Sequence, residues 1–351
     1  MPMREKLFVI PLAVALSAGL GAAPVPKIRR PVEVPTTAGT MPSLPPAIVD
    51  PALTIGGDDV KARQAQSRLS VEVHVNGSGP YQFVVDSGAD SSVIGLRIAQ
   101  NLRLPLGTPV ILNSMTGTSI VDRVHTSSLK LGPTTVSDLE LPALREEDLG
   151  GQGLIGIDAL VRRRLMMDFE QHKIKVEDAS VPIKFVPGEI VVVGKRRRGQ
   201  LILTHVKARS IELDAVIDTG SELTIGNLLL REKLVRRRTP LGRVEAIGVN
   251  GKKVDLDVAI IPELAIGPIV IRNLPVAFAD LPPFKVFGID RQPALFLGTD
   301  VLQRFRRVSL DFQARKVRFQ LRKCEPADFT LVRTTSLGGS FPSTPASQSC
   351  G

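Results

Sequence analysis

The chain contains the same short stretch twice, first as Phe83-Val84-Val85-Asp86-Ser87-Gly88-Ala89 and again as Ala215-Val216-Ile217-Asp218-Thr219-Gly220-Ser221. In each copy an apolar run ends in Asp-Ser/Thr-Gly, and Asp218 follows Asp86 by 132 positions (218 − 86). An apolar, β-branched run before such a triplet predicts a strand that delivers an aspartate to a turn. A single triplet is a weak signal, because short glycine-bearing motifs recur by chance.

Two further blocks repeat downstream in the same order. Gly153–Leu160 matches Leu295–Leu302 with an offset of 142 (298 − 156). Arg164–Val176 matches Arg307–Phe319 with an offset of 143 (311 − 168). Three blocks in one order indicate an internal duplication, and hence two related lobes.

The duplication offers a way to bring Asp86 and Asp218 together across a pseudo-twofold axis. Two carboxylates at one site cannot easily both ionise, so they share a proton. One can then act as a base while the other acts as an acid, which is the chemistry of peptide hydrolysis by an activated water. Gly88 and Gly220 are expected to let the backbone turn sharply, so that its N–H groups face the carboxylates.

Length and composition set the fold class. A chain of 351 residues is long enough for two domains. Aromatic residues are only 4%, so the core should be mainly Val, Leu and Ile, and 30 Gly and 27 Pro predict many turns in a β-rich fold with short helices. The expected organisation is a signal peptide at 1–23, a disordered linker or pro-segment at 24–65, an N-terminal lobe at 66–188, a C-terminal lobe at 189–325 and a flexible tail at 326–351.

Export is predicted from the N-terminus. Arg4 and Lys6 precede an apolar stretch, Leu7–Leu20, which is short for a membrane span and ends in small residues. We expect the lobes to be periplasmic or secreted after cleavage, and an uncleaved anchor is the alternative. Cys324 and Cys350 permit one disulfide in an oxidising compartment, or two free thiols.

The net charge is +10, and the basic residues come in runs at 162–164, 195–198, 236–238 and 304–307. We interpret these runs as solvated faces with weak attraction to anionic envelope surfaces. Nucleic acid is not expected as a partner, because no aromatic platform is present to stack bases on.

Asp168 and Asp311, equivalent in the two copies, are interpreted as structural turn residues.

No cofactor or metal is expected. The four histidines are dispersed, with no metal-ligand spacing. Gly151-Gln152-Gly153-Leu154-Ile155-Gly156 matches a dinucleotide fingerprint by letters, but Glu146-Glu147-Asp148 precedes it in place of a strand.

Local patterns predict the elements around the two aspartates. Strands are expected over Leu69–Val75, Tyr81–Val85, Leu201–Val206 and Ile211–Ile217, with turns at 76–79 and 207–210. Short helices are expected over Leu96–Leu102 and Leu228–Val235. Pro187–Gly199 is predicted to connect the lobes.

The segment Asp86-Ser87-Gly88-Ala89-Asp90-Ser91-Ser92-Val93-Ile94 resembles the active-site segment of retroviral-type aspartic proteases, and the second copy is similar to pepsin-family sites. The resemblance covers roughly residues 66–325. It implies an all-β fold of two related pepsin- or retropepsin-like lobes with a pseudo-twofold cleft, complete in one monomer. It assigns the catalytic pair to Asp86 and Asp218, the active-site turns to Ser87, Gly88, Ala89, Thr219, Gly220 and Ser221, and the adjacent apolar-Gly segments to Leu154, Ile155, Gly156, Phe296, Leu297 and Gly298.

Two glycine-bearing hairpins are candidates for flaps over this cleft, and ordinary exposed turns are the alternative. Their residues are Met115, Thr116 and Gly117 in one copy and Val249, Asn250 and Gly251 in the other. The predicted function is an aspartic endopeptidase that cleaves a peptide or protein substrate with a water activated between Asp86 and Asp218. The competing hypothesis is a non-catalytic module that keeps the fold and binds peptides by strand addition.

Overall fold

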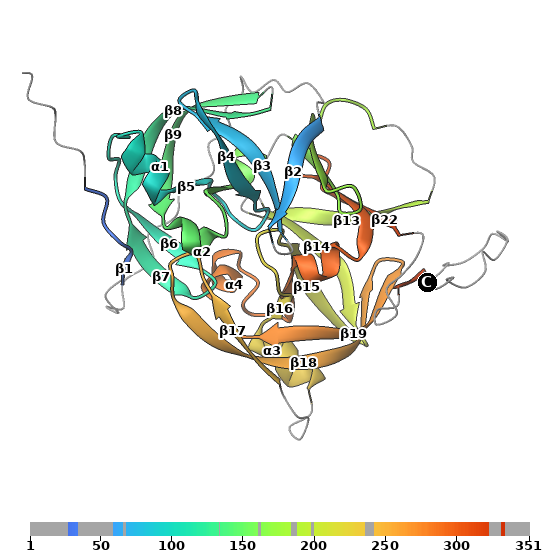
Figure 1. The fold of residues 1–351 in the computed structure, drawn as a ribbon. Coiled ribbons are helices and arrows are strands. Elements are labelled where there is room, and N and C mark those ends of the chain that lie inside the picture. The colour runs from blue at the N-terminus through green and yellow to red at the C-terminus, as the bar shows by residue number, and fades with distance from the viewer. Residues whose placement is uncertain are drawn as a thin grey trace, which may run out of the picture.

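The computed structural model describes residues 27–33, 59–65, 68–132, 134–160, 163–183, 188–197, 200–235, 242–322 and 331–333. They form an all-β, two-lobed fold with a few short helices (Figure 1). First-lobe strands run from blue to green in the figure, and second-lobe strands from yellow to orange. In this part of the chain, no helix combines the length and apolar character that crossing a membrane requires. The predicted signal peptide, the run at 236–238 and both cysteines lie outside the described residues.

The first lobe is a sheet built around the strand that carries Asp86. The alternating residues Val71, Val73 and Val75 of β3 are fully buried, as expected for a strand with one face on the core. β10 lies parallel to β4 and antiparallel to β5, which brings the apolar-Gly segment beside Asp86. The elements are β3 (Arg68–Val75), β4 (Ser78–Val85), β5 (Val93–Gly95), α1 (Leu96–Asn101), β6 (Val110–Ser114), β7 (Gly117–Val121), β8 (Arg123–Leu131), β9 (Thr134–Leu144), α2 (Glu146–Leu149), β10 (Gly153–Ile155) and the 3-10 helix η1 (Ile157–Ala159).

The second lobe repeats this connectivity. β20 lies parallel to β15 and antiparallel to β16, so the second apolar-Gly segment runs beside Asp218. The duplication predicted from the sequence is therefore present in the topology. The elements are β14 (Gln200–Ala208), β15 (Ile211–Ile217), β16 (Ile225–Gly226), α3 (Leu228–Leu234), β17 (Gly242–Ile247), β18 (Lys253–Ile266), β19 (Ile269–Phe278), α4 (Pro282–Val286), β20 (Ala294–Leu297) and α5 (Thr299–Leu302).

A sheet made of strands from both lobes joins them. Its strands follow the order β2 (Asp59–Ala65), β12 (Lys173–Asp178), β11 (Arg163–Asp168), β21 (Phe305–Asp311), β22 (Lys316–Leu321) and β13 (Glu189–Arg197). β11 and β21 belong to the repeated blocks and pair antiparallel, with Met166 opposite Ser309. Equivalent strands from the two copies thus meet at the pseudo-twofold axis, and the sheet holds one lobe against the other.

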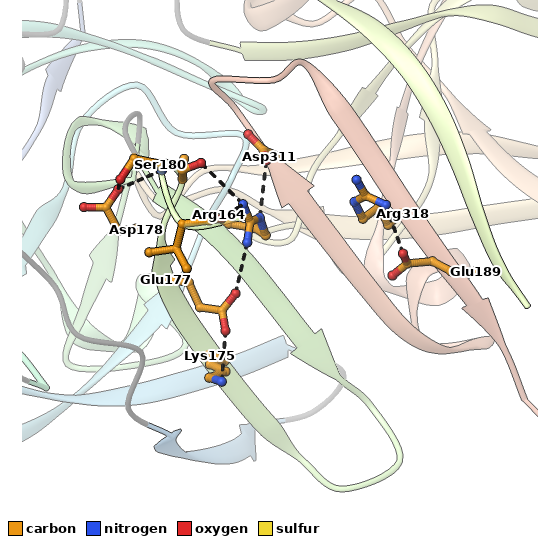
Figure 2. Close-up of polar contacts among 10 residues, drawn as sticks. Arg164, Lys175, Glu177, Asp178, Ser180, Glu189, Asp311 and Arg318 are labelled. Carbon is orange, nitrogen blue, oxygen red and sulfur yellow. Dashed lines mark hydrogen bonds and ion pairs between the residues drawn. The ribbon is translucent and has the colours of Figure 1, made fainter. Parts of the chain in front are cut away.

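Two matched ion pairs cross this junction. Arg164 Nε lies 3.3 Å from Asp311 Oδ2, and Arg307 Nε lies 2.5 Å from Asp168 Oδ2. Figure 2 shows the Arg164 side chain between Asp311 and Glu177. Asp168 and Asp311 also accept backbone N–H groups in the turns that follow them, which supports a structural role for both.

The prediction of a solvated face is wrong for part of the run at 162–164. Arg163 and Arg164 are 1% and 5% exposed, because their strand lies inside the sheet between the lobes. Arg163 pairs with Asp178 at 3.3 Å, and Arg164 also donates to Glu177 and to the carbonyl of Val181. A buried guanidinium needs such partners, since an unpaired buried charge is strongly destabilising.

The boundaries of the predicted linker, connection and tail also need correction. Within 24–65, β1 (Val32–Glu33) pairs with β7, and β2 pairs with β3 and β12. β13 occupies most of the predicted connection and pairs with β22 and β14 (Figure 1). In the tail, β23 (Leu331–Arg333) pairs with β19. Main-chain hydrogen bonds to a neighbouring strand hold these segments in place, and a strand needs no distinctive side chains to make them.

The elements predicted around the aspartates are confirmed with small shifts. The four predicted strands correspond to β3, β4, β14 and β15, and both short helices end one residue earlier than expected. β14 continues to Ala208, so the turn before β15 is shorter than the predicted 207–210.

Candidate active site

The two Asp-Ser/Thr-Gly turns interlock where the lobes meet. Ser87 N donates to Thr219 Oγ1 at 2.9 Å, and Thr219 N donates to Ser87 Oγ at 3.2 Å. Each hydroxyl donates in turn to a carbonyl of the opposite strand, Ser87 Oγ to Ile217 at 2.8 Å and Thr219 Oγ1 to Val85 at 2.8 Å. Four buried hydrogen bonds therefore hold the two turns in a reciprocal arrangement.

Backbone N–H groups orient the two carboxylates. Asp86 Oδ1 accepts from Gly88 N at 2.8 Å and from Ala89 N at 3.0 Å. Asp218 Oδ1 accepts in the same way from the N–H groups of the two equivalent residues, at 3.0 and 3.1 Å. In both copies one carboxylate oxygen is held by the turn, which leaves the other oxygen available to a ligand.

The glycine N–H groups face the carboxylates as expected, and glycine is required in both turns for a steric reason as well. Neither Gly88 nor Gly220 has a positive φ, so no left-handed backbone is involved. A Cβ on Gly88 would lie 2.6 Å from Asp218 Oδ1, and a Cβ on Gly220 would lie 2.2 Å from Asp86 Cγ. Each glycine makes room for the carboxylate of the opposite lobe, and this also shows how closely the two aspartates approach.

The two carboxylates differ in their electrostatics. Burial raises the pKa of Asp218 to about 8, and the negative charge of Asp86 adds to the shift. Burial also raises the pKa of Asp86, but hydrogen bonds from Gly88 and Ala89 and the charge of Arg68 oppose that rise. At neutral pH the pair therefore holds a proton, with Asp218 as the more readily protonated member.

A second pair of aspartates supports the turns, and the sequence analysis missed it. Asp158 Oδ1 accepts from Ser92 Oγ at 2.7 Å, and Asp300 Oδ1 accepts from Thr224 Oγ1 at 2.7 Å. The same two hydroxyls accept the N–H groups that follow the apolar pairs, those of Gly156 and Gly298. Each hydroxyl thus ties an Asp turn to its apolar-Gly segment. The repeat offset of 142 between Asp158 and Asp300 was the signal that could have found them.

The apolar-Gly segments lie as the resemblance implied. Leu154 and Phe296 line the cleft, whereas Ile155 and Leu297 are fully buried behind it. Gly156 and Gly298 pack against backbone: a Cβ on either would lie 2.5 Å from the carbonyl carbon of Ser91 or of Leu223.

A cleft of about 800 Å³ opens above the aspartates, between the lobes. It is lined by Asp86, Gly88 and Ala89 from one turn and by Asp218, Gly220 and Ser221 from the other. Ser87 and Thr219 lie underneath, 1% and 2% exposed. The walls differ: α2 contributes Glu147 and Asp148, whereas α4 and the residue after it contribute Pro283, Val286 and Phe287.

The two predicted flap hairpins meet at their tips. Thr116 Oγ1 donates to Asn250 Oδ1 at 2.6 Å, and Asn250 Nδ2 donates to Ser119 Oγ at 3.3 Å. Met115 packs against a cluster of second-lobe residues, and Val249 packs against a first-lobe cluster. Each tip therefore reaches over to the opposite lobe. Met115, Thr116 and Val249 line the cleft, whereas Gly117, the first residue of β7, and the turn residues Asn250 and Gly251 do not line it.

Within the described residues, no group of three or more His, Cys, Asp or Glu side chains is placed to hold a metal ion.

Comparison with known families agrees with this geometry. Residues 71–162 match the family described as "gag-polyprotein putative aspartyl protease", and residues 204–301 match the family described as "Aspartyl protease". No curated protein matches the chain. Two aspartyl protease domains therefore follow one another in this chain, and with the all-β, two-lobed fold they define it as a bilobal retropepsin-like aspartic protease.

Proposed function

We propose that the chain is an aspartic endopeptidase that uses a water held between Asp86 and Asp218. The observation that carries this proposal is the interlocked pair of turns, which presents two oriented carboxylates on the floor of one cleft. Both aspartates come from a single chain, so we propose that the active form is a monomer. Export to the periplasm or the exterior is proposed from the N-terminal sequence alone.

The mechanism follows from the unequal carboxylates. Ionised Asp86 takes a proton from the water as the water attacks the scissile carbonyl carbon. Protonated Asp218 donates a hydrogen bond to the carbonyl oxygen as negative charge develops on it. The tetrahedral intermediate then breaks its C–N bond, and the nitrogen leaves with the proton that Asp86 received. No covalent bond to the enzyme forms.

The cleft and the flaps suit an extended peptide. Strand edges and hairpin backbones in such a groove can pair with a substrate main chain, and the walls then contact its side chains. Separation of the Thr116–Asn250 contact would admit the substrate, and closure would exclude water from the reacting atoms.

The test is cleavage of a peptide library by the wild-type protein and by Asp86→Asn and Asp218→Asn. Each variant should lose about 10²–10⁴-fold in kcat/KM, because one member of the acid–base pair is missing. Asp138→Asn, at an exposed carboxylate of β9 away from the cleft, is the matched control and should cleave normally. Wild-type folding of the Asn variants by circular dichroism is required, and a fully active Asn variant would refute the mechanism. Folded wild-type protein that binds peptides without cutting them would favour the non-catalytic module.

The pH profile tests the same assignment. Activity should fall as pH rises through about 8, because Asp218 then loses the proton that the mechanism needs. It should also fall on the acidic side as Asp86 is protonated, at a pH above the ordinary aspartate pKa of 3.8. A wild-type enzyme that stays fully active well above pH 8 would contradict the role given to Asp218.

A further inference from the structure

Each lobe sends one side chain across the junction to the opposite Asp turn. Gln200, on β14, donates from Nε2 to the carbonyl of Gly88 at 3.2 Å and to Asp90 Oδ1 at 3.1 Å. Arg68, on β3, occupies the equivalent position 132 residues earlier (200 − 68). The two side chains therefore occupy equivalent positions of the duplication, one in each lobe.

Arg68 makes the matching contacts. Its Nη1 donates to the carbonyl of Gly220 at 3.4 Å, and its Nε lies 3.5 Å from Glu222 Oε1. Gly220 and Glu222 are the repeat equivalents of Gly88 and Asp90, again 132 positions on (220 − 88). Arg68 also donates to the carbonyl of Leu149 at 3.2 Å. The two side chains thus reach equivalent groups of the opposite turn and differ in charge.

Of these two side chains, the charged one, Arg68, lines the cleft. Among the described residues that line it, Arg68 is the one cation. The other charged lining groups are all carboxylates: Asp86, Asp90, Glu147, Asp148, Asp218, Glu222 and Glu245. The positive charge lowers the pKa of Asp86 against the effect of burial, whereas the neighbouring negative charge of Asp86 raises the pKa of Asp218.

We propose that Arg68 is a positioning residue that makes the two halves of the aspartate pair unequal, holding Asp86 as the ionised base and leaving the shared proton on Asp218. Its catalytic consequence rests on the proposed function. Gln200 shows that a neutral amide can donate to the equivalent carbonyl of the opposite turn. Holding the two lobes together at this point therefore does not require a charge. The guanidinium supplies what the amide cannot, which is a fixed positive charge on one side of a symmetric site.

The experiment compares Arg68→Gln with the charge-conserving Arg68→Lys. Arg68→Gln introduces the residue type found at the equivalent position 200 of the second lobe. Removal of the charge should move the acidic limb of the kcat/KM profile upward by about one pH unit, because protonation of Asp86 becomes easier. Arg68→Lys should keep the limb near that of the wild type. Glu222→Gln, at a half-exposed position, should move the limb the other way, because the charge of Arg68 is then less neutralised.

Equal shifts in the Gln and Lys variants, or no shift in Arg68→Gln, would overturn the proposal. If Arg68→Gln fails to fold, Glu222→Gln provides the test. An acidic limb that does not move to lower pH in Glu222→Gln would also overturn the proposal. Carbon-13 NMR titration of the Asp86 and Asp218 carboxyl groups supplies a readout that needs no cleavage. An inactive wild type would therefore count against the proposed function alone, whereas unchanged carboxyl titration in Arg68→Gln would count against this inference alone.

Discussion

The two lobes hold their aspartates in the same way but surround them differently. Both turns use the same backbone N–H groups, and both depend on a glycine that the opposite carboxylate approaches closely. Around these turns the lobes diverge: Arg68 contacts one and Gln200 the other. In the first lobe α2 lines the cleft with acidic side chains, and in the second α4 lines it with apolar ones. Steric and hydrogen-bond requirements at the axis allow few residue types, whereas charge and wall shape are free to differ. A duplicated fold can therefore carry an unequal site.

The largest difference should appear in the two ion pairs between the lobes. The side chain of Arg164 is 6% exposed and that of Arg307 is 33% exposed, although their partners Asp311 and Asp168 are both buried. Arg164→Met should lower the free energy of unfolding by about 3–5 kcal/mol, since it leaves a buried carboxylate without its cation. Arg307→Met should cost less, because water can reach Asp168 in its place. Urea denaturation measures both.

A reciprocal substitution sharpens that result. Asp311→Asn in the Arg164→Met background removes the stranded charge and should recover part of the loss. An equal loss in the free energy of unfolding for Arg164→Met and Arg307→Met would show that the difference in exposure between the two arginines does not affect stability.

The next effect concerns the interlocked hydroxyls, where the lobes should behave alike. Ser87→Ala removes the acceptor of one buried N–H and the donor to one buried carbonyl, and Thr219→Val does the same in the other turn. Each should cost about 1–3 kcal/mol. Because the two side chains share one network, the double variant should cost less than the sum, as a double-mutant cycle in urea would show. Strict additivity would mean that the two hydroxyls act independently.

The smallest effect is expected at the flap tips. Asn250→Ala removes the contacts to Thr116 and Ser119, a net loss of about 1 kcal/mol. KM should rise by about fivefold, because the tips close less firmly over the peptide. Thr118→Val removes a hydroxyl that bonds to Asn113 within its own hairpin and is the comparison variant. Equal KM values in both variants would argue against a role for contact between the tips.

Much of the site followed from the residues themselves. The repeated Asp-Ser/Thr-Gly stretch and the two blocks after it were enough to predict two lobes, the paired aspartates and the adjacent apolar-Gly segments, because those features are local runs with a constant order. The hairpins were found for the same reason, as glycine-bearing turns between strands. The supporting contacts made by four other residues were not found. Asp158, Asp300, Arg68 and Gln200 have ordinary local patterns, and only their equivalence under the repeat offset marks them.

The sequence by itself determined the duplication, the strand-and-turn pattern of each half and the identity of the two acids, since all of these depend on neighbours along the chain. Only the tertiary structure decided that Arg164 is buried, that β1, β2 and β23 are strands, and that a glycine makes room for the opposite carboxylate. The physical reason is that burial, strand pairing and the charge felt by an aspartate are properties of groups that meet from distant parts of the chain.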